Sequence, residues 1–151
     1  MKIQPASFFR RLIAYLIDTM PITIFVTSIA MLFFGFGASV ETFLKDPTDF
    51  SARKDFQIET QIISSICTVI WIIYCIVMET SAQQGTFGKK IMNIKVVNAN
   101  GEKLSFEQAF KRNTTKVVSM LVLHIGYIWM IFDPARQTWH DKFGEAHVVG
   151  A

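Results

Sequence analysis

Hydrophobic residues along the chain gather in three windows without a charged side chain: residues 19–40, 60–78 and 117–132. The windows hold 22, 19 and 16 residues. A helix rises about 1.5 Å per residue and the hydrocarbon core of a bilayer is about 30 Å thick, so the first two windows can each cross it. The third, about 24 Å long as a helix, either crosses a locally thinned bilayer or enters and returns. The pattern predicts an all-α membrane protein with about three transmembrane helices, the third short and open to a re-entrant path.

A small β-hairpin is predicted between the second and third windows. Residues 91–97 have the character of a strand, and the Asn100-Gly101 pair that follows is a strong signal for a tight hairpin turn. Residues 103–106 are the candidate return strand. The tail offers another partner, because Val148-Val149 can pair with Val96-Val97. That pairing would hold the tail on the same side as the hairpin and contradict three simple crossings.

A further helix is predicted after the hairpin. Ser105 and Gln108 have the spacing of a capping box, which opens a helix that runs through Arg112. Its apolar stripe consists of Phe106, Ala109 and Phe110, and its charged residues lie off that stripe: Glu107, Lys111 and Arg112.

Composition and charge narrow the class of protein and set its orientation. The chain has 151 residues, of which 51% are hydrophobic, and its 15 basic and 12 acidic residues give a net charge of +3. The uncharged windows exclude an ordinary soluble globule, a disordered chain and a collagen-like chain. With the N-terminus in the cytoplasm, 10 basic residues fall on the inner side and 5 on the outer side of a three-span chain, as the positive-inside tendency favours. We expect one domain, residues 1–151, in the cytoplasmic membrane, with the N-terminus and the hairpin in the cytoplasm.

Asp18 is a carboxylate inside the first apolar helix. It follows Arg11 by seven residues, about 700° of helix rotation, so the two side chains share a helix face. A carboxylate at the centre of a membrane helix costs at least about 2.5–3.5 kcal/mol unless it faces the interior of the bundle, pairs with a cation or contacts water. Asp18 is therefore either an ion or proton site or a structural carboxylate held by an arginine.

Other polar residues extend this candidate charge network. Arg10 and Arg11 are expected to anchor the chain at the cytoplasmic surface, and one of them to pair with an acidic residue such as Asp133 or Asp141 in the tail. His124, in the third window, is a candidate proton relay or a neutral histidine bonded to a neighbouring helix. The spacing of histidine and acidic residues matches no metal signature, so neither a metal nor another cofactor is expected.

The basic segment Gly85-Thr-Phe-Gly-Lys-Lys90 resembles a phosphate-binding loop only superficially. A P-loop requires G-x-x-x-x-G-K-[ST] after a strand, and here the glycines are three residues apart after a membrane helix. We expect this segment to meet anionic lipid headgroups. Nucleic acid is not an expected partner.

Several separate blocks together resemble the RDD family of small integral membrane proteins. They are residues 9–18, 85–97, 100–102, 110–113, 132–136 and 139–141, with the closing Val-Val pair. The family is named for one arginine and two aspartates. The resemblance puts the arginine at Arg10 or, more favoured, Arg11, the first aspartate at Asp18, and the second at Asp141 with Asp133 as the alternative. It implies transport, with monovalent cation/proton antiport proposed for some members.

Two functional hypotheses follow, and neither is an enzyme. In the first, the protein transports a small ion or solute as a homo-oligomer or with a membrane partner, because two or three spans cannot enclose a pathway alone. The Arg-Asp-Asp network would be its central site. In the second, the protein is a membrane scaffold or accessory protein that binds a partner through its basic loop, including Lys111 and Arg112.

Overall fold

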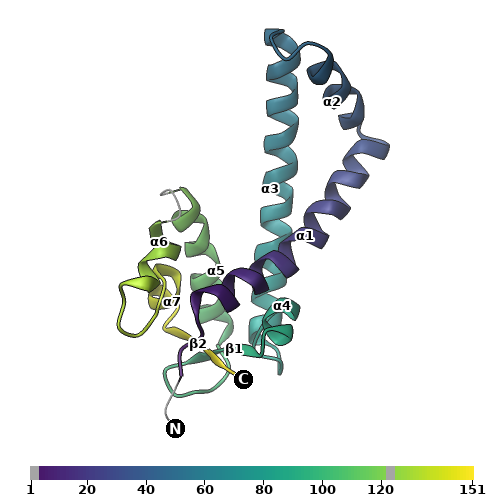
Figure 1. Ribbon diagram of the computed structural model, residues 1–151. Coiled ribbons are helices and arrows are strands. Elements are labelled where there is room, and N and C mark those ends of the chain that lie inside the picture. Colours follow the sequence, from purple (N-terminus) through teal and green to yellow (C-terminus); the bar gives the residue numbers. More distant parts are fainter. Residues whose placement is uncertain (1–3, 122–124) are drawn as a thin grey trace. The chain divides into compact units, whose positions relative to one another are not determined.

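The computed structural model describes residues 4–121 and 125–151, and most of them are helical (Figure 1). Among these residues, two helices are long and apolar enough to cross a membrane: α1 (Phe8–Phe33) and α3 (Phe50–Thr80). Over an 18-residue window their mean hydropathies are 1.8 and 2.2. α1 covers the first apolar window as far as Phe33 and α3 covers the whole of the second, so two long apolar helices are found where the sequence predicts them. The other elements are α2 (Phe36–Lys45), α4 (Phe87–Ile91), β1 (Ile94–Asn98), α5 (Phe106–Leu121), α6 (Ile125–Ile128), the 3-10 helix η1 (Trp129–Ile131), α7 (Trp139–Phe143) and β2 (Ala146–Gly150).

The chain divides into two compact units. The first combines the start of the chain, through Asp18, with the chain from Ile72 onward. The second is the segment Thr19–Trp71. Because the division falls inside α1 and α3, each long helix contributes one end to the first unit and the rest to the second.

In the second unit, most of the segment between the first two apolar windows is helical, because α2 and the first turns of α3 occupy it. α1 ends just before Gly35, whose left-handed φ of +77° favours glycine and redirects the chain into α2. α3 begins at Phe50, ten residues before the second apolar window. This early start has a local cause, because the carboxylate of Asp49 accepts hydrogen bonds from the backbone N–H groups of Ser51 and Ala52 and caps the helix.

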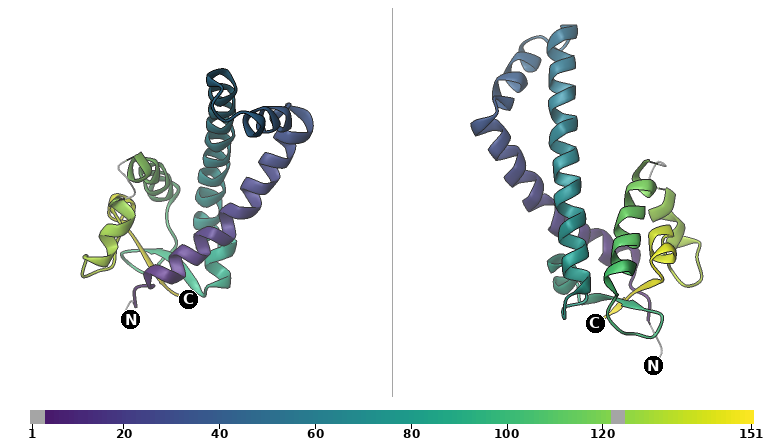
Figure 2. Two further views of the ribbon diagram at one scale, coloured as in Figure 1. Left: turned by 45° about the horizontal axis from the view of Figure 1, so that its top comes forward. Right: turned by 180° about the vertical axis from the view of Figure 1, so that it is seen from behind.

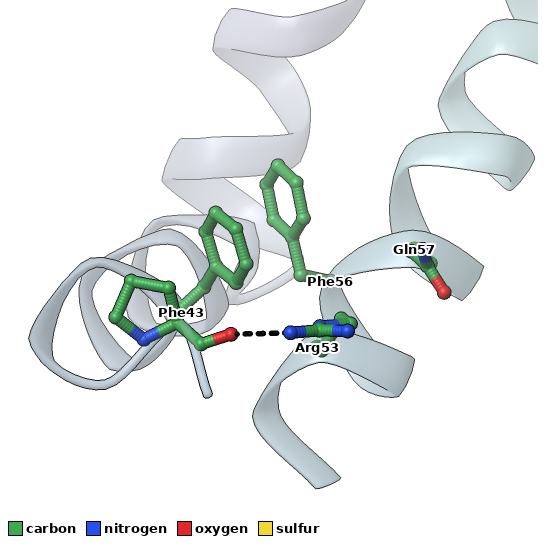
Figure 3. A pocket seen from close by; sticks show the side chains of 5 residues that line it. Phe43, Arg53, Phe56 and Gln57 are labelled. Carbon is green, nitrogen blue, oxygen red and sulfur yellow. Dashed lines mark hydrogen bonds between the residues drawn. The ribbon is translucent and has the colours of Figure 1, made fainter. Parts of the chain in front are cut away.

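A pocket of about 400 Å³ lies in the second unit beside this turn (Figure 3). The rings of Phe43 and Phe56 stack with centroids 4.5 Å apart. Arg53 donates a hydrogen bond from Nη2 to the carbonyl oxygen of Pro47 at 3.0 Å. The lining of the pocket therefore includes two stacked aromatic rings and one cationic side chain, Arg53, which its hydrogen bond to Pro47 holds in place.

In the first unit, β1 pairs with β2 in antiparallel register, and not with residues 103–106. The predicted turn does form, with Gly101 at a φ of +84° and the backbone N–H of Asn98 bonded to the carbonyl of Glu102. The hairpin goes no further, because β1 takes β2 of the tail as its partner strand. Val96 lies opposite Val148, and both are almost fully buried. The local hairpin prediction was wrong, and the alternative pairing of Val96-Val97 with the tail is confirmed.

The sheet also gathers the start of the chain. Ala6 donates its backbone N–H to the carbonyl of Val148 at 2.9 Å, and Pro5 forms a bridge with Val149. The surrounding core consists of Ala6, Ala14, Ile76, Ile94, Val96, Leu104, Ala109, Ala146 and Val148. The N-terminal lead, the segment after α3 and the tail thus meet at one place.

The third apolar window is not one continuous helix. α5 ends at Leu121, and the described chain resumes as α6 at Ile125. α5, α6 and α7 lie side by side in the views of Figures 1 and 2. Gly126 packs so closely on α5 that a Cβ there would come within 2.4 Å of Ser119 Oγ. The chain has therefore turned back along α5 by Gly126.

Candidate functional site

Glu79 forms the first centre of a buried charge cluster. It occupies the last turn of α3 and its side chain is fully buried. Its Oε1 accepts hydrogen bonds from Arg112 Nη1 at 2.5 Å and from Lys89 Nζ, and its Oε2 accepts one from Asn113 Nδ2 at 2.9 Å. Lys116 Nζ lies 3.8 Å from Oε1. Both carboxylate oxygens are thus satisfied, as burial of a charge requires.

Asp141 forms the second centre. It lies in the first turn of α7, where it makes a reciprocal capping box with Thr138. Its Oδ2 accepts a hydrogen bond from Arg11 Nη1 at 2.6 Å, and its Oδ1 lies 2.9 Å from Nε and 2.7 Å from Nη2 of Arg112. Burial raises the pKa of Asp141, but Arg112 and the other neighbouring positive charges outweigh burial and hold that pKa well below its usual range. Asp141 is therefore ionised at neutral pH.

Arg112 joins the two centres, because its guanidinium bonds both Glu79 and Asp141. Burial opposes the charge on Arg112, but Glu79 and Asp141 together raise its pKa above the ordinary value. We call the connected set the buried charge cluster; its members are Arg11, Glu79, Lys89, Arg112, Lys116 and Asp141. The cluster contains four cationic side chains and two carboxylates, so it carries a net charge of +2 when every member is ionised.

Lys116 is a member of the cluster whose charge is disfavoured by burial. Only 4% of the residue is exposed, and its Nζ bonds the Asn113 side-chain oxygen. Burial lowers the pKa of Lys116, and the repulsion of Arg112 and Lys89 adds to this against the attraction of Glu79. A lysine in these surroundings gives up its proton more readily than a lysine in water.

The cluster depends on how α5 presents its side chains. Residues three and four apart share one face of a helix, and five such positions of α5 are buried: Ala109, Arg112, Asn113, Lys116 and Ser119. This face meets the end of α3 through Glu79 and the start of α7 through Asp141. Gly144 permits the close fit, since a Cβ there would lie 2.5 Å from Arg112 Cβ.

Asp18 lies outside the cluster in a contact of its own. Its Oδ1 accepts a hydrogen bond from the backbone N–H of Gly88 at 2.8 Å and one from the hydroxyl of Tyr74 at 3.3 Å. That hydroxyl in turn accepts from the N–H of Phe87 at 2.8 Å. A Cβ on Gly88 would come within 2.2 Å of the carbonyl oxygen of Ala14. Gly88, in the segment compared above with a phosphate-binding loop, is thus the point at which the chain packs against α1.

His140 is buried beside the cluster. Only 4% of it is exposed, and its ring centroid lies 4.8 Å from that of Tyr127. Burial lowers the pKa of His140 well below the usual value, so the imidazole is neutral at physiological pH. Its Nε2 lies 3.9 Å from Asp141 Oδ1, but without a proton this approach is not an ion pair.

The structure brings together only some of the predicted site residues. Arg11 and Asp141 form an ion pair, whereas Arg11 and Asp18 do not pair although they share α1. Arg10 is exposed, and its backbone N–H faces the Ser7 hydroxyl. Asp133 pairs with Lys142, away from the cluster.

Two further expectations from the sequence concern Arg112 and His124. Arg112, expected beside the exposed Lys111 and off the apolar stripe, is 2% exposed and lies in the cluster. The expectation failed because it assumed that the apolar side of the helix faces inward. His124, the candidate relay, lies outside the described residues.

Sequence reasoning missed the centre of the cluster. Glu79 is not among the predicted site residues, although it directly follows the uncharged window that ends at Met78. An acid at the end of a membrane helix is a signal for a buried partner. The Thr138-x-x-Asp141 spacing of a capping box was a second available signal.

Comparisons with known proteins now bear on this architecture. The model of the RDD family matches residues 5–145. The chain belongs to the RDD family. The uncharacterised protein YxaI of Bacillus subtilis (strain 168) is similar to it, with 29% identity over 151 residues and 97% of each chain covered. No solved structure matches this RDD protein. RDD membership and the two apolar helices together indicate an integral membrane protein.

Proposed function

We propose that this RDD protein transports a small ion across the cytoplasmic membrane as a homo-oligomer, and that the buried charge cluster is its ion and proton site. The observation that carries the proposal is the imbalance of the cluster, in which four cationic side chains, the buried Arg112 and Lys116 and the partly buried Arg11 and Lys89, meet two carboxylates. An excess of positive charge supports a site that exchanges a proton or an anion.

The charges favour an anion over an alkali cation. Both carboxylates already accept hydrogen bonds from cationic donors, Glu79 from Lys89 and Arg112, and Asp141 from Arg11 and Arg112. A sodium or potassium ion would have to displace one of these donors at a site that is positive overall. An anion is attracted there when Lys116 is protonated and is less attracted when it is neutral. This favours coupled movement of a proton and an anion over cation/proton exchange.

Two crossing helices per chain cannot enclose a route for an ion, so the transport proposal includes assembly of several copies. The N-terminal lead and the segment after α3 meet at the sheet, which suits an even number of crossings between them. Seven of the 15 basic residues lie between residues 79 and 116, and the positive-inside tendency puts this side in the cytoplasm. Basic side chains there, such as Lys90, are available to anionic lipid headgroups.

The test is proton movement into liposomes that contain the purified protein and a pH-sensitive dye. With the membrane potential clamped, an inward gradient of chloride, nitrate or phosphate is applied, and sodium is exchanged for potassium or choline in parallel. We expect proton entry that depends on the anion and is indifferent to the cation. Lys116→Met should abolish this coupling. Lys111→Met is the matched control, because Lys111 is exposed on the same helix and pairs with Glu107.

Two results would contradict parts of the proposal. Proton movement that follows sodium or potassium whatever the anion would favour cation exchange and reject the anion. Absence of movement with every gradient, in liposomes that hold folded oligomer, would count against transport. Of the two residues named for the partner surface of the scaffold hypothesis, Lys111 is exposed and Arg112 is buried.

A further inference from the structure

α5 is built with its polar side inward and its apolar side outward. Five residues of its buried face are at most 4% exposed, and they include an arginine, an asparagine, a lysine and a serine: Ala109, Arg112, Asn113, Lys116 and Ser119. On the opposite face Phe106 is 69% exposed, Phe110 49% and Val118 53%. The rings of Phe106 and Phe110 stack 6.3 Å apart without a cover from the described chain.

This arrangement is the reverse of a helix at the surface of a soluble protein, which turns its aromatic side inward and its charges to water. A surrounding of lipid favours the reverse, because acyl chains accept apolar side chains while ionisable groups must face the protein interior. The exposed charges of α5 support the same environment. Glu107 and Lys111 form an ion pair in its first turns, and beyond Lys111 the exposed face carries no charge up to Val118.

The length of α5 fits half of a bilayer. From Lys111 to its end at Leu121 the helix rises about 15 Å, which is half of the roughly 30 Å hydrocarbon core. Gly126, in α6, lies against Ser119, so the chain has turned back by that point. The segment from α5 to α7 begins and ends on the same side of the bilayer. This follows because β1 precedes α5, β2 follows α7, and the two strands are paired.

We infer that α5 is a half-membrane helix whose Phe110–Val118 face contacts lipid acyl chains, and that α6 returns the chain to the side from which it entered. Lipid acyl chains therefore cover the exposed face of α5. The same unit supports this occupant, because the adjoining ends of the crossing helices also expose apolar side chains: Leu16, Ile73 and Val77. The inference needs only that the protein is membrane-embedded and is independent of transport.

The experiment measures the surroundings of single spin labels in proteoliposomes. Cys67 and Cys75 are first replaced by serine and alanine, and one label is then attached at Val118→Cys, Phe110→Cys or Glu145→Cys. Accessibility to oxygen, which dissolves in lipid, is compared with accessibility to a water-soluble nickel chelate. Labelled proteins are compared only where their gel-filtration profile matches the wild type. Glu145 is exposed just before β2 and serves as the aqueous control.

We expect the label at Val118 to favour oxygen strongly, the label at Phe110 to favour it less, and the label at Glu145 to favour the nickel chelate. A nickel-accessible label at Val118 would overturn the inference, because the face would then lie in water. Low accessibility to both reagents, with spin–spin broadening that disappears on dilution with unlabelled protein, would overturn it in favour of a second copy as the occupant. Thr114→Cys, one turn before Val118, gives a second reading if the first variant fails to fold.

Discussion

Replacement of Gly88 by alanine is expected to destabilise the protein strongly. A Cβ at this position would lie 2.2 Å from the Ala14 carbonyl oxygen and 3.0 Å from Asp18 Cγ. The oxygen belongs to the backbone of α1, so no side-chain rotation can move it away. The segment must therefore withdraw from α1, and the buried hydrogen bond from Gly88 N–H to Asp18 Oδ1 at 2.8 Å is lost.

The size of this effect follows from its two parts. Overpacking a tight contact costs about 1–3 kcal/mol, and loss of a hydrogen bond to a charged group costs about 1.5–3 kcal/mol. The variant should therefore lose roughly 2.5–6 kcal/mol of its free energy of unfolding. At about 2–4 °C per kcal/mol for a chain of this size, the Tm should fall by at least about 5 °C.

Gly85→Ala is the matched control from the same motif. A Cβ there would meet only the flexible Lys89 side chain, at 3.3 Å and beyond, so its Tm should stay close to that of the wild type. The assay is thermal loss of monodisperse protein in detergent, recorded for both variants and the wild type. If Gly88→Ala and Gly85→Ala melt together, the chain does not dock on α1 through Gly88, and the reasoning is refuted.

Two further predictions concern the buried charges. Asp141→Asn should lower the free energy of unfolding by about 3–5 kcal/mol, because it removes the charge that Arg11 and Arg112 face; Asp133→Asn, whose partner Lys142 is 45% exposed, should have a much smaller effect in the same melting assay. The depressed pKa of His140 means that the unfolded chain binds a proton near pH 6.5 that the folded chain does not, so stability should fall as the pH drops below that value. His140→Gln should flatten the change in Tm between pH 7.5 and 5, and an unchanged pH profile would contradict a buried neutral His140.

The two long apolar helices could be predicted from sequence because the signal for each is a long, continuous run of uncharged residues. Residues 19–40 and 60–78 are uncharged throughout; α3 contains the whole second window, and α1 contains the first window as far as Phe33. The capping box of Ser105 and Gln108 was also predictable, since its two hydrogen bonds join residues three apart. The sheet was harder, because Asn100-Gly101 is a strong local signal that competed with a strand some fifty residues away.

The buried charge cluster could not be predicted because its contacts are long-range and its helix is inverted. The pairs of Glu79 with Arg112 and of Arg11 with Asp141 span 33 and 130 residues. A single sequence gives no measure of such distances. The prediction for α5 also assumed that its apolar stripe faces the protein core and its charged side faces water, which would expose Arg112. The assumption fails for a helix whose polar face meets two carboxylates.

Asp18 and the buried charge cluster differ in the groups that bond their carboxylates, and this difference separates their roles. Asp18 is held by donors without charge, the N–H of Gly88 and the hydroxyl of Tyr74, so Asp18→Asn removes one charge and leaves no unpaired cation behind. The change should lower stability and spare any proton coupling. Lys116→Met removes a buried cation from a cluster with positive charge in excess, so it should spare stability and abolish coupling. Opposite results for the two variants, measured by melting and by flux, would assign transport to Asp18 and structure to the cluster.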